Sequence, residues 1–289
     1  MTKITLPMCG AALLAAAFGL PGSVWASSYA VSYNSISGFT LAFDGGAGDL
    51  SQFTLSVDAS VTNYGLDGGL SLKDAPAACL NCSYSNSFTS HGSASEYAYG
   101  DAEIVSRQVL SGIGAANSIG EISAFNSTGR SGGSNTMLAS FSVADSPGSV
   151  SFGFLSSPYM NASLTSGGVS ANTNQLMSIS IYQGLTKVFD WKPDGIAGNA
   201  FGGNDSTDPF TLNSGLSMNG LFNPGSGSFA ASTSSLATGT YTLKITMANY
   251  VDATAVPLPA AVWLFGSGLV PLLAIGRRKS FKREKTTKV

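Results

Sequence analysis

The sequence predicts an all-β fold for residues 27–255, an antiparallel β-sandwich of jelly-roll type. Charged residues make up only 10% of the 289-residue chain, and 35 residues are glycine. Apolar and polar residues alternate in several short segments, which is typical of half-buried strands. Clusters of Gly, Asn and Asp separate these segments, and frequent turns favour a sandwich over a helical bundle. A hydrophobic content of 44% argues against disorder.

The expected strands carry large apolar residues at every second position. They are Ser37–Asp44 (Phe39, Leu41, Phe43), Ser51–Asp58 (Phe53, Leu55, Val57), Ser149–Ser156 (Val150, Phe152, Phe154) and Thr238–Met247 (Tyr241, Leu243, Ile245, Met247). Residues 177–191 predict a hairpin with its turn at Gln183-Gly184. We expect one domain, with two smaller sandwiches as the alternative.

The N-terminal residues 1–26 have the features of a secretory signal peptide. Lys3 gives a positive start, residues 11–20 are apolar, and Pro21-Gly22 ends the apolar run. Small residues precede the expected cleavage point after Ala26. The segment therefore predicts export, with a signal helix that the mature protein lacks.

The C-terminal residues predict a short membrane span. Residues Ala260 to Ile275 carry no charge and would span about 24 Å as a helix. With residues 256–259 they just reach the roughly 30 Å thickness of the hydrocarbon layer. The basic residues Arg277, Arg278 and Lys279 follow and would stay on the cytoplasmic side. These residues alone predict an exported body, one transmembrane helix and a cytoplasmic stub.

The same segment resembles a PEP-CTERM sorting signal. The likeness rests on the motif Val256, Pro257, Leu258, Pro259, Ala260, on the apolar run that follows, and on the Arg-Arg-Lys stop. Leu258 stands where the eponymous motif has Glu. The resemblance covers residues 256–289 only. It implies an exosortase as partner, which is a membrane-embedded transpeptidase of Gram-negative bacteria that make exopolysaccharide. It also implies a transient inner-membrane anchor and delivery to the cell surface or extracellular matrix.

The charge distribution excludes one class of partner. Residues 27–275 contain six basic and fifteen acidic side chains, while seven basic residues lie in the last thirteen positions. An acidic body provides no electrostatic attraction toward nucleic acid. We therefore expect no nucleic-acid partner.

Cys79 and Cys82 form a Cys-x-x-Cys pair that predicts a small disulfide in an oxidising compartment. A redox site, a zinc site that includes His91, and free thiols are the alternatives. His91 is the only histidine, so a Ser-His-Asp site would have to use it. A Ser-His-Asp hydrolase is therefore disfavoured, and His91 is expected in a surface loop.

The stretch of residues 188–210 is the most polar and irregular. Its carboxylates Asp190, Asp194, Asp205 and Asp208 are candidate Ca²⁺ ligands, because Ca²⁺ takes six to eight oxygens, and an ordinary loop is the alternative. Trp191 with Phe201 would offer a stacking face for sugar rings if exposed. We expect Trp191 in the core instead.

The function expected from these features is that of a non-enzymatic exported protein. It would be structural or adhesive at the cell surface or in the exopolysaccharide of a biofilm. The alternatives are a calcium-dependent carbohydrate-binding module and a secreted polysaccharide-modifying hydrolase. The body holds only three glutamates, Glu96, Glu103 and Glu121. Scarcity of His and of charged residues disfavours the hydrolase, since catalytic sites draw on them. Ca²⁺ is the only cofactor that the sequence suggests.

Overall fold

The computed structural model describes residues 26–48, 50–63, 70–73, 77–78, 93, 96–106, 108–125, 127–165 and 168–255. All of these residues fall within one compact unit. Apart from the short 3-10 helix η1 (Val109–Ser111), regular structure in these ranges is β-strand. The prediction of an all-β antiparallel fold is confirmed. The expected signal helix and transmembrane helix lie outside the described residues, and none of the described helical structure is long and apolar enough to cross a membrane.

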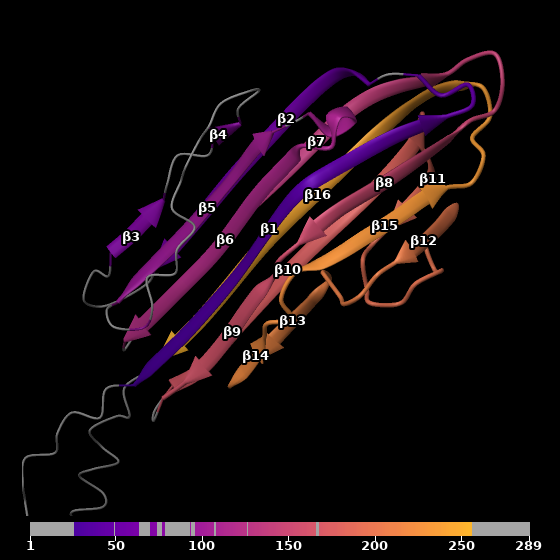
Figure 1. Cartoon of the computed structure of the whole chain (residues 1–289). Coiled ribbons are helices and arrows are strands. Elements are labelled where there is room, and N and C mark those ends of the chain that lie inside the picture. The colour runs from indigo at the N-terminus through magenta and orange to yellow at the C-terminus, as the bar shows by residue number, and fades with distance from the viewer. Residues whose placement is uncertain are drawn as a thin grey trace, which may run out of the picture. The chain divides into compact units, whose positions relative to one another are not determined.

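The larger sheet contains ten of the described strands. Its main path runs β12-β15-β8-β1-β6-β5-β3, with β4, β9 and β14 paired beside that path, and Figure 1 shows β3 and β12 at opposite edges. Pairing is antiparallel except where β3 and β4 meet β5. The strands are β1 (Ser27–Asp44), β3 (Leu70–Lys73), β4 (Ala77–Ala78), β5 (Tyr97–Ser106), β6 (Gly114–Phe125), β8 (Ser149–Ser156), β9 (Tyr159–Leu164), β12 (Gly203–Thr207), β14 (Gly220–Phe222) and β15 (Gly227–Thr233).

The smaller sheet contains six of the described strands, in the order β11-β10-β16-β7-β2 with β13 paired to β10. Its central strand β16 pairs with β10 on one side and β7 on the other along nearly its whole length. The strands are β2 (Ser51–Asn63), β7 (Thr128–Val143), β10 (Gly168–Gln183), β11 (Thr186–Trp191), β13 (Ser214–Ser217) and β16 (Gly239–Ala255). All these pairs are antiparallel.

The strands predicted from alternation are all present. Phe39 and Leu41 on β1 and Val150, Phe152 and Phe154 on β8 are buried, as expected. On β16 the predicted inward positions are buried or half-buried, and the strand continues eight residues beyond the predicted end at Met247 to Ala255. Strand β2 is also observed, although the side chains of its residues 53 and 57 lie outside those described.

The predicted hairpin is present, but its turn lies one residue later than expected. Gln183 pairs with Thr186, so Gly184 and Leu185 form the two-residue loop between β10 and β11. Gly184 has φ 60°, which suits the first central position of a type II′ turn and which only glycine adopts without strain.

The core between the two sheets is aromatic at one end. Phe154 stacks on Phe39 and Phe229 with ring centroids 5.7 and 5.0 Å apart, and its ring lies 5.6 Å from that of Trp191. Phe152 stacks on Phe189 of the opposite sheet at 5.5 Å. These large side chains form one cluster of buried residues from both sheets, so burial of aromatic area stabilises this end most.

The other end of the core is built from alanine. Buried residues from both sheets form a separate cluster there: Ala26, Ala30, Ala98, Ile122, Ala124, Ala162, Ala171, Val251, Ala253 and Ala255. Small side chains require the sheets to approach closely. A Cβ placed on Gly133 of β7 would lie 1.8 Å from the carbonyl oxygen of Asp101 on β5, so glycine is required at that contact.

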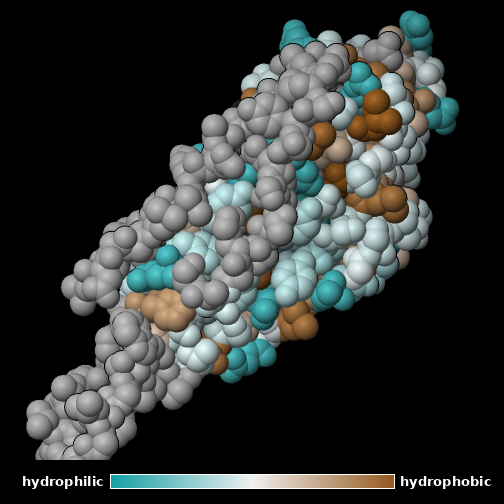
Figure 2. Space-filling view, turned by 60° about the vertical axis from the view of Figure 1, so that its left-hand side comes forward, coloured by the Kyte–Doolittle hydropathy of each residue, from teal (hydrophilic) through white to brown (hydrophobic). Residues whose placement is uncertain are grey.

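Among the coloured residues in Figure 2, pale and teal predominate, and brown residues are most frequent at the upper right. Exposed large hydrophobic residues lie in different parts of the chain: Leu185 in the β10–β11 turn, Phe201 between β11 and β12, and Leu221 on β14. Exposed apolar residues scattered in this way are normal on a folded protein.

Candidate functional site

Three of the four predicted calcium ligands come together in the loops around β12. The backbone N–H of Asp194 donates to Asp208 Oδ2 at 2.8 Å. Asp205 Oδ1 accepts from the N–H groups of Asn199 and Ala200 at 2.7 and 3.1 Å. Asp194 Oδ2 accepts from Asn199 Nδ2 at 2.8 Å. These carboxylates thus hold the loop by accepting local hydrogen bonds, as aspartates in irregular segments commonly do.

Asp208 is the carboxylate most affected by its surroundings. Burial raises the pKa of Asp208 to about 6. Hydrogen bonds from the backbone N–H groups of Asp194 and Gly195 oppose this increase in pKa, while the charges of Asp194 and Asp205 add to it. Asp208 Oδ1 and Asp205 Oδ2 are buried and have no hydrogen-bond partner among the described residues. The loop therefore contains closely spaced carboxylates with incomplete hydrogen bonding.

Asp190 does not join this cluster. It accepts a hydrogen bond from Ser180 Oγ at 2.6 Å and forms an ion pair with Lys187 Nζ at 3.1 Å. The hydrogen bond from Lys187 to Asp190 raises the pKa of Lys187. Within the described ranges, no group of three or more His, Cys, Asp or Glu residues is arranged to hold a metal ion. The structure thus separates Asp190 from the other three candidate ligands.

Trp191 is fully buried in the aromatic core, as expected, while Phe201 is 62% exposed. The two residues therefore do not form a shared stacking face for sugar rings. The reason is the pleat of β11, which directs Phe189 and Trp191 inward at alternate positions.

The buried carboxylates Asp101, Glu103 and Glu121 lie on adjacent strands of the larger sheet. Glu121 accepts a hydrogen bond from the Tyr29 hydroxyl at 2.6 Å, and Asp101 accepts one from the Tyr99 hydroxyl at 3.0 Å. Glu103 accepts from an asparagine amide at 2.8 Å. All three are at most 2% exposed. Burial and the hydrogen bond to Glu121 raise the pKa of Tyr97.

The two buried glutamates are poorly spaced for glycoside hydrolysis. In the β5–β6 ladder Glu121 lies opposite Tyr99, four residues from Glu103. Four residues of strand correspond to about 13 Å, while a catalytic pair of carboxylates lies about 5–10 Å apart. Asp101 lies two residues along the ladder from each of these positions, or about 7 Å, which is within that range, but neither pocket considered below contains two carboxylates.

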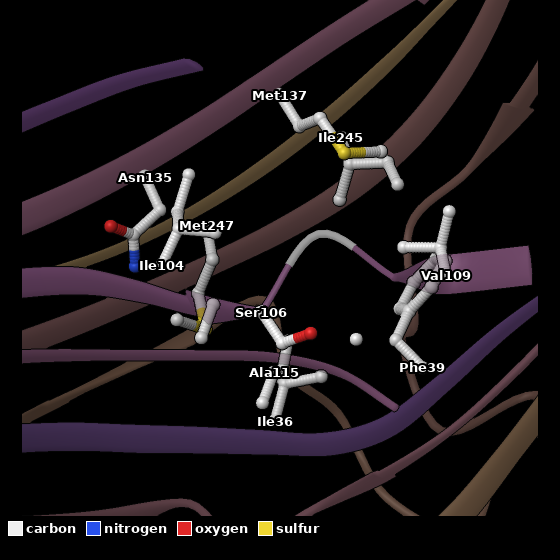
Figure 3. A pocket seen from close by; sticks show the side chains of 12 residues that line it. Ile36, Phe39, Ile104, Ser106, Val109, Ala115, Asn135, Met137, Ile245 and Met247 are labelled. Atoms are coloured by element: carbon white, nitrogen blue, oxygen red, sulfur yellow. The ribbon is translucent and has the colours of Figure 1, made fainter. Parts of the chain in front are cut away.

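One pocket is an apolar space inside the core. It measures about 50 Å³, and Figure 3 shows the side chains of Ile36, Phe39, Met137 and Met247 around it. The polar Asn135 in its lining donates through Nδ2 to the carbonyl of Asn117 at 2.8 Å. The lining contains no ionisable group, and Asn135 Oδ1 has no hydrogen-bond partner among the described residues.

A second pocket is a polar groove on the outer face of the smaller sheet. We call it the outer groove. It measures about 440 Å³ and is lined by Arg130, Ser131, Asn172, Thr173, Asn174, Tyr250, Val251 and Asp252. Its outward-facing side chains come from three neighbouring strands, β7, β16 and β10. A volume in this range is typical of pockets that bind small molecules or short polymer segments.

Cross-strand register builds the outer groove. Asp252 on β16 lies directly between Arg130 on β7 and Asn172 on β10. Two residues along, Tyr250 lies between Gly132 and Asn174. Asn172 Nδ2 donates a hydrogen bond to Asp252 Oδ2 at 2.8 Å. These residues are far apart in sequence, and sequence reasoning missed the site. The only signal in the sequence is the alternation in "YVDA", where Tyr250 and Asp252 are separated by an apolar residue; in "ANTNQ" residues 172–175 are all polar and show no alternation.

Several predicted sites lie outside the described residues. These are the disulfide candidates Cys79 and Cys82, His91, the C-terminal motif with its span and basic tail, and the signal segment before Ala26. Those predictions remain predictions.

Comparisons with protein-family models, with curated proteins and with solved structures found no match.

Proposed function

We propose that this chain is an exported, non-enzymatic protein of the cell surface or extracellular matrix, with a jelly-roll-like sandwich as its mature body. An exosortase would recognise the C-terminal signal, release the body from its transient inner-membrane anchor and deliver it to exopolysaccharide. The role of the body would be structural or adhesive.

The observation that carries this proposal is the position of the C-terminal motif. The central strand β16 ends at Ala255, and the motif Val256-Pro257-Leu258-Pro259 follows at the next residue. Both prolines fix φ and disfavour the α region at the residue before them, so the motif favours an extended backbone. An extended segment directly after the last strand suits recognition by a peptidase cleft.

The body gives further support for a role without catalysis. Asp101, Glu103, Glu121, Asp205 and Asp208 each accept at least one hydrogen bond from a tyrosine hydroxyl, an amide or a backbone N–H group. A surface rich in Ser, Thr, Asn and Gly is suited to contact with hydrated, hydroxyl-rich material, because it offers many hydrogen-bonding groups and little charge.

The test is to determine the C-terminus of the mature protein by mass spectrometry after isolation from its native host. We expect the residues beyond the motif to be absent. In a strain that lacks the exosortase, or in a Pro257→Ala/Pro259→Ala variant, we expect the intact chain in the membrane fraction. A Leu221→Ala variant, changed on an exposed strand of the body, serves as the matched control and should be processed normally. A wild-type chain that still ends at Val289 would contradict the proposal.

A further inference from the structure

The outer groove on the smaller sheet has the features of a carbohydrate site. We infer that it binds a chain of uncharged sugars, with Tyr250 as the stacking platform and with Asp252, Asn172 and Arg130 as the hydrogen-bonding groups. This inference rests on the proposed function, because it names the partner of the exported body.

The polar groups are held in position before any ligand arrives. The hydrogen bond from Asn172 Nδ2 to Asp252 Oδ2 fixes the planes of both side chains across β10 and β16. Asp252 Oδ1 and Asn172 Oδ1 remain as acceptors, and Arg130 adds guanidinium donors from the adjacent strand. Each hydroxyl of a sugar ring can donate and accept a hydrogen bond. A planar carboxylate, amide or guanidinium group can therefore form two hydrogen bonds to two adjacent hydroxyls.

The aromatic ring lies beside these groups. A Cβ placed on Gly132 would lie 2.3 Å from Cδ1 of Tyr250, so the ring occupies the space left by the missing side chain. Tyr250 nevertheless remains 41% exposed. An aromatic residue supported by backbone and open to solvent can cover the apolar C–H face of a sugar, while its hydroxyl stays in water.

The charge of the groove selects against other ligands. Asp252 and Arg130 lie in the same cross-strand row and carry opposite charges. A single cation beside a carboxylate is a poor site for nucleic acid or for a strongly acidic polymer, which need clusters of basic residues. The polar lining also argues against an apolar peptide.

The face beyond the groove leaves room for a polymer. Four residues along β16 from Tyr250, Thr246 lies between Thr136 and Ser178. Thr246 lies six residues along the strand from Asp252, or about 20 Å away. In the intervening row Ala248 and Ser134 are small, while Leu176 of β10 is 44% exposed, so a sugar chain that runs along β16 from the groove would pass beside this leucine.

The experiment uses the full chain purified in detergent and measures its retardation in native gels that contain polysaccharide. The uncharged probes are dextran, galactomannan, xyloglucan and the neutral fraction of the host exopolysaccharide. Alginate and dextran sulfate are the acidic probes. We expect at least one uncharged probe to retard the wild-type chain. Tyr250→Ala and Asp252→Ala should each lower the affinity for that probe about tenfold or more. Tyr250→Phe should change the affinity by no more than about threefold.

Matched controls lie on the same face of the same sheet. Tyr182→Ala removes an outward tyrosine from the far end of β10, and Asp190→Asn changes a carboxylate that pairs with Ser180. Both should bind as the wild type does, and thermal unfolding of every variant checks that it is folded. Retardation by acidic probes only, by no probe, or equally in folded Tyr250→Ala overturns the inference. Normal C-terminal processing without sugar binding would refute the sugar site and leave the proposed function intact. Sugar binding by a chain that is never processed would refute the proposed function and leave the sugar site intact.

Discussion

Asn249 on β16 donates a hydrogen bond of 2.7 Å to Ser32 Oγ on β1, and so connects the two sheets through the middle of the core. Its side-chain amide oxygen Oδ1 accepts a second hydrogen bond from Ser118 Oγ on β6. Ser32 in turn donates to the carbonyl of Asn174 at 3.1 Å. Asn249, Ser32 and Ser118 are fully buried, so water cannot replace any of these partners.

We therefore predict that Asn249→Ala destabilises the protein strongly. The substitution leaves the Ser118 hydroxyl without its acceptor and Ser32 Oγ without a donor. Each buried polar group left unpaired costs about 1–3 kcal/mol, so the free energy of unfolding should fall by about 2–4 kcal/mol. Urea denaturation followed by intrinsic fluorescence measures it. Asn174→Ala, at an exposed position on the neighbouring strand, is the control and should change the free energy by less than about 0.5 kcal/mol. Equal effects of the two substitutions would refute the role of the bridge.

A second prediction concerns the close approach of the sheets at Gly133. Gly133→Ala would place a Cβ 1.8 Å from the Asp101 carbonyl oxygen, and backbone cannot move aside as a flexible side chain can. The two sheets must separate at this point, at a cost of about 3 kcal/mol or more. Gly153→Ala is the control, because its new Cβ would meet its nearest neighbour at an ordinary 3.4 Å. Thermal unfolding should show a large decrease in midpoint for Gly133→Ala alone, and similar midpoints would contradict the packing described here.

The fold was predictable where strands carry large residues at alternate positions. Phe39 and Leu41, or Phe152 and Phe154, contrast with polar neighbours, so their strands are visible in the sequence. Strands β5, β6 and β7 have no such contrast, because their inward positions include Ala98, Ala102 and Gly133. Small residues are needed at these positions because the two sheets approach closely there. The close approach depends on contacts between distant segments, so no single segment of the sequence reveals it.

The sites were less predictable than the fold because they depend on register. Asp194 and Asp208 lie fourteen residues apart and meet through a backbone N–H. Asp190 is nearer to Asp194 in sequence, but the pleat of β11 turns it toward Ser180. The outer groove needs Arg130, Asn172 and Asp252 in one row, and only the pairing of β16 with both neighbours aligns them.

A third prediction follows from the burial of Trp191. Trp191→Ala should lower the free energy of unfolding by about 3–5 kcal/mol, because a large aromatic side chain leaves a cavity among Phe154 and its neighbours. Trp191→Phe should cost less, since the indole N–H has no partner among the described residues. Phe201→Ala is the exposed control and should be nearly neutral in stability. A loss of polysaccharide binding in Phe201→Ala, with stability kept, would show that the β11–β12 loop contacts sugar after all.

The last prediction concerns pH and the buried carboxyl of Asp208. Its pKa is about 6 in the folded protein, because burial disfavours the charged form, while an aspartate in the unfolded chain has a pKa of about 3.9. Between these two values the folded protein binds a proton that the unfolded chain releases. The contribution of Asp208 to stability therefore increases as the pH falls from about 7 to about 4.

Asp208→Asn should reveal this contribution by removing the titration. The amide oxygen can still accept the hydrogen bond from the Asp194 N–H, and the side chain carries no charge at any pH. At pH 7.5 we expect the variant to be more stable than the wild type, by at most about 3 kcal/mol. The advantage should shrink through pH 6 and vanish near pH 4, as measured by urea unfolding at a series of pH values. Ser206→Ala, a non-titrating change on the exposed side of β12, should follow the wild-type pH profile. A difference in unfolding free energy between Asp208→Asn and the wild type that stays constant from pH 4 to pH 7.5 would contradict the raised pKa. The Asp208 carboxyl would then not be buried as described, and the carboxylate cluster would have another arrangement in solution.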